Sequence, residues 1–166
     1  MKGITVALFC AAFLLSAIVA PSNAGAAPAH EAGARFGDVE GREWVLMGLR
    51  RGADNIQMDR EHLAEYGFGE IFTIKFEDGR VSGMGAPNRF FGPYTVGGNR
   101  ALRIGSENGA LATTMMMPLV EPDVLREHEY FMYLSRVIRW DLRGGRLELY
   151  TSSAAGIETV LVFVPK

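Results

Sequence analysis

The chain has 166 residues, with 19 acidic and 17 basic side chains, and its only cysteine is Cys10. This length provides one hydrophobic core, and the weakly acidic balance lacks the positive charge that nucleic-acid binding requires. We therefore expect a single domain with no nucleic-acid partner and no disulfide within the chain.

Residues 1–24 have the composition of a cleavable secretory signal peptide. A basic start precedes an apolar run over residues 4–20, and small residues follow it. The small-x-small rule places the cut after Ala24, or alternatively after Ala26. We therefore expect an exported protein, periplasmic or secreted, with no membrane span in the mature chain.

The mature chain begins with a stretch that has no periodicity. Residues 25–40 are rich in Ala and Gly and predict a flexible leader, and the folded domain is expected over residues 41–166. The apolar residues 44–49 predict a first strand. The polar stretch at 51–69 predicts an excursion from the domain, with a helical turn at 60–65.

Strand signals dominate the rest of the chain. Residues 72–76 alternate apolar and polar side chains, and Asp78-Gly79 predicts a tight hairpin turn before the next strand at 80–82. Gly144-Gly145 is a second hairpin signal. The last strand is apolar on both faces, which predicts a central position. Further strands are expected at 90–96, 101–104, 110–116, 137–142, 146–150 and 159–164.

One helix interrupts the strands. Pro122 suits a first helical position, and Asp123 suits the cap or first turn. Tyr130, Leu134 and Val137 are spaced to share one apolar face, which we expect the sheet to cover.

Several short motifs, in their order and spacing, resemble the META domain, also called the heat-shock HslJ-like family. The resemblance runs from about Trp44 to Phe163. Its motifs are residues 44–46, 76–83, 88–95, 113–118, 147–149 and 161–163, together with Glu127, Tyr130 and Leu134. Relatives commonly carry a cysteine pair where this chain has Pro87 and Met117, so a redox or disulfide role is not expected here.

The resemblance implies a mostly β (α+β) fold: an antiparallel curled sheet or incomplete barrel of about eight strands, with one packed α-helix. It also implies a bacterial envelope protein linked to heat or antibiotic stress, with no established enzymatic chemistry. A similar fold occurs in lipid-binding pilotins of secretion systems, which is an analogy of fold alone.

The family signature suggests a candidate interaction loop at residues 88–94. As a recognition loop it would display Asn88, Arg89 and aromatic rings; as a structural bend it would use its glycines for a tight path and an aromatic ring to fill the core. Turn chemistry accounts for every residue type there, which favours the structural interpretation. The candidate residues are Gly83, Asn88, Arg89, Phe90, Phe91, Gly92 and Tyr94.

No motif of the chain predicts catalysis, a cofactor or a metal site. The histidines are His30, His62 with Glu65 on the excursion, and His128 on the helix, which is too few convergent ligands. Ser82 precedes Gly83, but Arg80 occupies the position of the first glycine of a nucleophile elbow, and the predicted context is a hairpin. A hydrolase is therefore the least favoured hypothesis.

Two functional hypotheses remain. The first is a non-enzymatic envelope protein, monomeric, that acts through contacts with an unidentified envelope protein during stress. The second is a carrier of a small lipophilic ligand, held in an apolar cavity between sheet and helix and lined by Phe72, Met116, Tyr130 and Leu134. Residues 115–117 are expected in a strand with one side in the core, because Met chiefly fills gaps in cores. The other interpretation is an adaptable apolar surface that is sensitive to oxidation.

Overall fold

The structure is a computed structural model that describes residues 33–117, 122–152 and 156–166. The predicted signal peptide and its cleavage sites lie outside the described residues. Within the described ranges, no helix is long and apolar enough to cross a membrane.

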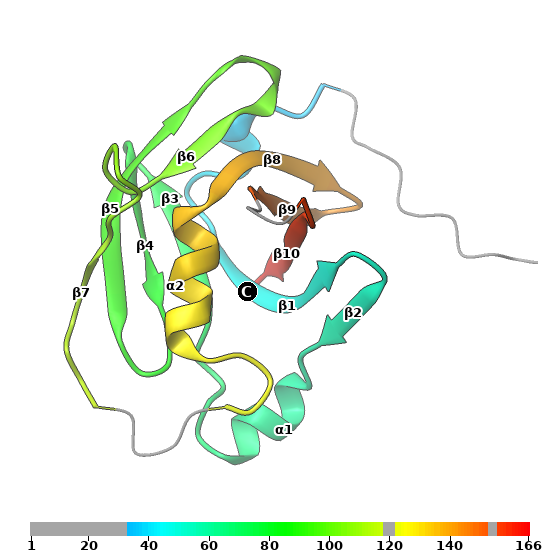
Figure 1. The fold of residues 1–166 in the computed structure, drawn as a ribbon, viewed down its shortest axis with the longest axis vertical. Helices are drawn as coiled ribbons and strands as arrows, with labels where there is room; N and C mark the ends of the chain where they lie inside the picture. Colours follow the sequence, from blue (N-terminus) through cyan, green and yellow to red (C-terminus); the bar gives the residue numbers. More distant parts are fainter. Residues whose placement is uncertain (1–32, 118–121, 153–155) are drawn as a thin grey trace, which may run out of the picture.

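The fold is a strongly curled antiparallel sheet that nearly closes on itself (Figure 1). Its main path runs β6-β5-β4-β3-β1-β10-β9-β8, while β2 pairs with β1 and β7 pairs with β5. A single bridge between Ala101 and Arg139 joins the two ends of this path. The strands are β1 (Glu43–Arg51), β2 (Asp54–Gln57), β3 (Thr73–Glu77), β4 (Arg80–Met84), β5 (Arg89–Val96), β6 (Leu102–Ile104), β7 (Ala112–Thr113), β8 (Val137–Arg143), β9 (Arg146–Thr151) and β10 (Thr159–Pro165).

The two predicted hairpins are confirmed. Asp78 and Gly79 connect β3 to β4 with φ of 49° and 74°, and Gly144 and Gly145 connect β8 to β9 with φ of 55° and 71°. Two consecutive residues with positive φ match the right-handed twist of the flanking strands, and Gly or Asp adopts this conformation readily. The central position of β10 is also confirmed, since it lies between β1 and β9.

The main helix, α2 (Glu127–Ser135), packs against the inside of the curled sheet (Figure 1). Tyr130 and Leu134 are fully buried, and the Tyr130 ring lies 5.1 Å from that of Phe72. The predicted start at Pro122 is wrong. Arg126 has an extended backbone and its N–H donates to the Glu129 carboxylate, so the helix begins only after it.

The excursion after β1 contains α1 (Arg60–Glu65), at the predicted turn, and also β2, which was not predicted. The Asp59 side chain accepts from the His62 N–H at 3.0 Å and caps α1. The Arg60 guanidinium donates to the carbonyls of Leu46 and Ile71, and this contact anchors α1 against the barrel. Burial lowers the pKa of Arg60.

The prediction of a flexible leader is wrong for its last residues. Phe36 lies in a 3-10 turn, η1 (Phe36–Asp38), and its ring lies 5.2 Å from those of Phe76 and Trp140. Val39 is fully buried, and its carbonyl accepts from the Trp44 indole N–H. These apolar side chains close one end of the barrel, so the folded domain begins before residue 41.

The expected strand at 110–116 is mostly wrong. Only Ala112 and Thr113 pair with β5 as β7. The three methionines that follow are exposed, at 97% for Met115, 60% for Met116 and 88% for Met117, so none of them fills the core. We call these three residues the methionine segment.

Candidate functional site

A buried polar network ties the family signature to the start of α2. The Glu127 side chain is 9% exposed, and its Oε1 accepts from the backbone N–H groups of Ala86 and Asn88, both at 2.6 Å. Its Oε2 accepts from Asn88 Nδ2 at 2.7 Å. One carboxylate therefore satisfies three donors of the β4–β5 connection, and charge-assisted bonds of this kind are strong.

Asn88 carries the same network to the methionine segment. Its Oδ1 accepts from the Met116 N–H at 2.6 Å and from the Thr114 hydroxyl at 2.9 Å, and its Nδ2 also donates to the Met116 carbonyl at 3.0 Å. The amide of Asn88 thus binds both backbone groups of Met116, much as a neighbouring strand would. The backbone of the segment is held while its side chains remain exposed.

The glycines of the signature permit close approach of backbone and side chains. A Cβ on Gly83 would lie 2.1 Å from the Thr73 carbonyl oxygen, and one on Gly85 would lie 2.5 Å from Glu127 Oε1. Since these separations are shorter than van der Waals contact, Gly83 requires glycine against the fixed carbonyl, and a Cβ on Gly85 would displace the Glu127 side chain. The glycines, Asn88 and Glu127 therefore form one structural unit.

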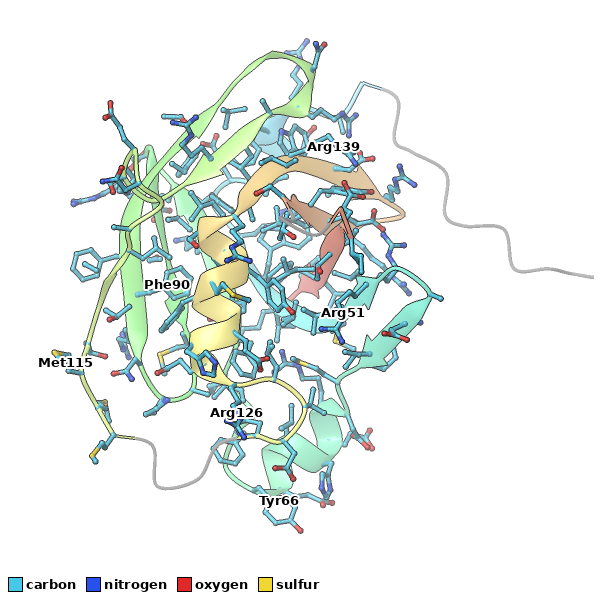
Figure 2. The ribbon with its side chains drawn as sticks, viewed as in Figure 1. Arg51, Tyr66, Phe90, Met115, Arg126 and Arg139 are labelled. Atoms are coloured by element: carbon cyan, nitrogen blue, oxygen red, sulfur yellow. The ribbon has the colours of Figure 1, made fainter. Side chains whose placement is uncertain are left out.

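The aromatic residues of the candidate loop point to opposite faces of β5. Phe90, labelled in Figure 2, is buried, and its ring lies 5.6 Å from that of Phe131 on α2. Tyr94 is also buried; its hydroxyl donates to Glu40, and burial together with this bond raises its pKa to about 12. Phe91 is 51% exposed on the outer face. The loop thus combines both interpretations, with a structural inner face and a displayed outer one.

An open groove of about 580 Å³ runs over the outer face of the sheet beside Phe91. We call it the outer groove. It is formed by Glu43, Glu70, Thr73, Lys75, Ser82, Gly83, Met84, Arg89, Phe90 and Phe91.

Most charges of the outer groove are already paired. Lys166 bonds with Glu43 and Glu70, and Lys75 Nζ lies 2.9 Å from Glu77. The pairing with Glu70 raises the pKa of Lys166. The exposed Arg89 side chain has no carboxylate partner among the described residues, so the groove presents an unpaired positive charge beside an apolar ring.

Three of the four residues predicted to line a cavity lie in the core, and the fourth lies at the surface. Phe72, Tyr130 and Leu134 are fully buried in the core, and the Tyr130 hydroxyl donates to the Thr73 carbonyl at 3.0 Å. The placement of Met116 with them is wrong, because its side chain is 60% exposed. Asn88 causes this difference, since it holds the Met116 backbone at the surface.

A smaller hollow of about 290 Å³ lies where the β1–β2 hairpin meets the chain entering α2. Leu49 and Leu125 form its buried apolar part, and Arg51 and Arg126, labelled in Figure 2, bring positive charge to its lining. Asp123 and Glu129 also line it and oppose that charge.

A ladder of ion pairs on the outer faces of β1, β8 and β9 was missed by sequence reasoning. Asp141 and Glu148 are opposite each other in register, and both side chains are 2% exposed. Arg143 Nε lies 2.8 Å from Asp141, Arg50 lies 2.8 Å from Glu148, and Arg100 also binds Asp141. The hydrogen bond with Asp141 raises the pKa of Arg143. The two-glycine turn between β8 and β9 fixes this register. The position of that turn in the sequence could therefore have predicted that Asp141 and Glu148 lie opposite each other.

The residues considered for catalysis lie on the surface. Ser82 is exposed on β4 and His128 is exposed on α2. His62 Nδ1 lies 3.7 Å from Glu65, and both side chains are exposed. Across the described ranges, no group of three His, Cys, Asp or Glu side chains is placed to hold a metal ion.

These features define a class of small, nearly closed antiparallel barrels whose single main helix packs inside the curl. The chain belongs to the META domain family, whose model matches residues 37–164. No curated protein matches the chain.

Two solved structures have a similar fold. A protein from Burkholderia xenovorans, determined by NMR, is 19% identical with a TM-score of 0.62, over 89% of this chain and 97% of that one. A crystal structure of a DUF4847 family protein from Bacteroides vulgatus is 15% identical with a TM-score of 0.51, over 78% of this chain and 95% of that one. At these identities the likeness concerns the fold alone.

Proposed function

We propose that this protein is an exported, non-enzymatic component of the bacterial cell envelope that binds a partner protein through the outer groove and the methionine segment. The occupant of this surface is an extended segment of the partner that carries apolar side chains and at least one carboxylate. The stress-linked role implied by the family resemblance is part of the same proposal.

One observation carries the proposal. Phe91, Met115, Met116 and Met117 are all more than half exposed, although Asn88, Phe90 and Tyr94 of the same signature are buried. Register places these residues along one edge, because β7 pairs with β5 at Phe91 and the Asn88 amide holds Met116. Exposed apolar clusters of this kind mark interaction sites, and flexible methionines adapt to partners of different shape.

Charge complementarity defines the partner further. The acidic side chains of the outer groove are occupied by Lys166, whereas Arg89 has no acidic partner among the described residues. A carboxylate of the incoming segment would pair with Arg89 while neighbouring apolar side chains contact Phe91. Pairs at the rim of an interface contribute more to specificity and association rate than to affinity.

The experiment places a photo-crosslinking amino acid at position 91 of the full-length chain in the native host. The matched control is position 66, because Tyr66 is 68% exposed and lies beyond α1, far from Met115 in Figure 2. We expect one envelope protein to crosslink at position 91 and not at 66. Its crosslinked segment, made as a peptide, should bind the purified protein, and Arg89→Glu should weaken binding about tenfold.

Three results would contradict the proposal. They are equal crosslinking at the two positions, a peptide that binds the Arg89→Glu variant as tightly as the wild-type protein, and a chain that keeps residues 1–24 in the cell. Intact mass of the recovered chain measures the last point, with cleavage after Ala24 or Ala26 expected. A lipid retained in the native mass spectrum would instead support the carrier hypothesis, for which the smaller hollow is the candidate site.

A further inference from the structure

The methionines of this chain differ widely in exposure. Met115, Met116 and Met117 are 97%, 60% and 88% exposed, whereas Met58 is 4% exposed and Met47, Met84 and Met132 are half-buried. Three consecutive exposed thioethers contrast with the usual place of methionine as a filler of gaps in the core. Since Cys10 is the only cysteine, thioethers are the only readily oxidised sulfur atoms in the described residues.

The fold keeps these thioethers accessible. The N–H of Thr114 donates to the Arg89 carbonyl at 3.0 Å, and Asn88 binds both the N–H and the carbonyl of Met116. Within the segment these bonds involve backbone atoms only, since the Asn88 side chain binds the Met116 main chain, so they place no demand on the methionine side chains. The segment is therefore fixed at the surface whether its side chains are apolar or polar.

We propose that the methionine segment is a site of reversible methionine oxidation by hydroperoxides. The thioether sulfur attacks one oxygen of hydrogen peroxide, a sulfur–oxygen bond forms, and the oxygen–oxygen bond breaks. The other oxygen leaves as water after proton transfer, and the peroxide is reduced as the sulfur is oxidised to the sulfoxide. A methionine sulfoxide reductase restores the thioether: the sulfur–oxygen bond breaks, the oxygen leaves as water, and a dithiol of the reductase is oxidised to a disulfide.

Oxidation changes the surface without changing the fold. A sulfoxide is polar and chiral, so up to three apolar side chains of the proposed docking surface would become polar. The bonds between the Asn88 side chain and Met116 persist, because on Met116 they involve main-chain atoms and not the thioether. The loss of partner binding on oxidation rests on the proposed function, whereas the site-selective oxidation does not.

The test is a hydrogen peroxide titration of the purified native protein, followed by peptide mass spectrometry at each methionine. We expect the three segment methionines to oxidise at least about tenfold faster than Met58, since oxidation follows exposure. The thermal unfolding midpoint of the oxidised protein should stay close to that of the untreated protein. Equal rates at all sites, or oxidation that begins at Met58, would overturn the proposal.

A variant with Leu at positions 115–117 separates the two proposals. Leucine keeps the apolar volume and has no sulfur, so this variant should take up no oxygen in the segment. If a partner binds as proposed, its peptide should bind the variant equally well before and after peroxide, while wild-type binding falls about tenfold. If no partner exists, the oxidation pattern of the wild-type protein still decides the present proposal.

Discussion

Replacing Glu127 by alanine removes one buried carboxylate and leaves three N–H donors without that acceptor. Those donors are the backbone N–H groups of Ala86 and Asn88 and one N–H of the Asn88 side-chain amide, which still donates to the Met116 carbonyl. Each unsatisfied buried donor costs about 1–3 kcal/mol. Because Glu127 is 9% exposed, water reaches part of the vacated space. We therefore expect Glu127→Ala to lower the free energy of unfolding by about 3–5 kcal/mol, the lower part of the sum for three donors.

Two further variants test the physical cause of this loss. Glu127→Gln retains one carbonyl oxygen for the two backbone donors and loses the acceptor for Asn88 Nδ2, so it should cost about 1–2 kcal/mol. Glu129→Ala, on the same helix, removes only an exposed bond to the Arg126 N–H and should cost about 1 kcal/mol or less.

The assay is urea unfolding at equilibrium, followed by the fluorescence of Trp44 and Trp140, which are both buried. Free energies come from linear extrapolation, with an unchanged dependence on urea required for comparison. If Glu127→Ala costs less than about 1 kcal/mol, or if the alanine and glutamine variants are equally stable, the network does not hold the loop as described.

Two other predictions concern stability. Gly83→Ala should cost about 1–3 kcal/mol in the same urea assay, because the added Cβ would lie 2.1 Å from the Thr73 carbonyl oxygen. Gly98→Ala is the control: a Cβ there meets nothing within 4 Å, so stability should change by less than about 0.5 kcal/mol. Similar losses of stability in the two variants would contradict the prediction. Burial and the Glu40 bond raise the pKa of Tyr94 to about 12, so above about pH 10 the unfolded chain releases this proton before the folded chain does, and the stabilisation present below pH 10 is lost as the pH rises toward 12. Tyr94→Phe should therefore give a flatter decline in unfolding free energy across this range, and an identical decline would count against the assigned pKa.

Local patterns in the sequence predicted most of the strands and both tight hairpins. Asp78-Gly79 and Gly144-Gly145 work as signals because positive φ at two successive positions is a requirement that few residues meet. The order of motifs also predicted the family, which the match over residues 37–164 confirms.

Long-range contacts account for what the sequence did not predict. The helix begins at Glu127, whose carboxylate is bound 39 residues away in the chain, at Asn88. Capping propensities at Pro122 and Asp123 carry no information about such a contact. Met116 was expected in a cavity because its apolar character suggested burial, but Asn88 holds its backbone at the surface. The export of the chain stays a prediction.

The pairing of β1 with β10 determines when the domain can fold. The first strand, β1, lies between β3 and β10, so the backbone groups along one of its edges have no strand partner until β10 is present. Trp44 is opposite Pro165, and Leu46 is opposite Phe163, more than a hundred residues later. Pairings of such separation form slowly, because the intervening chain loses entropy before the contact stabilises it. A nascent chain therefore cannot complete the sheet until β10 is available, and a truncation that removes β10 would leave Leu46 and Leu49 without their strand partners.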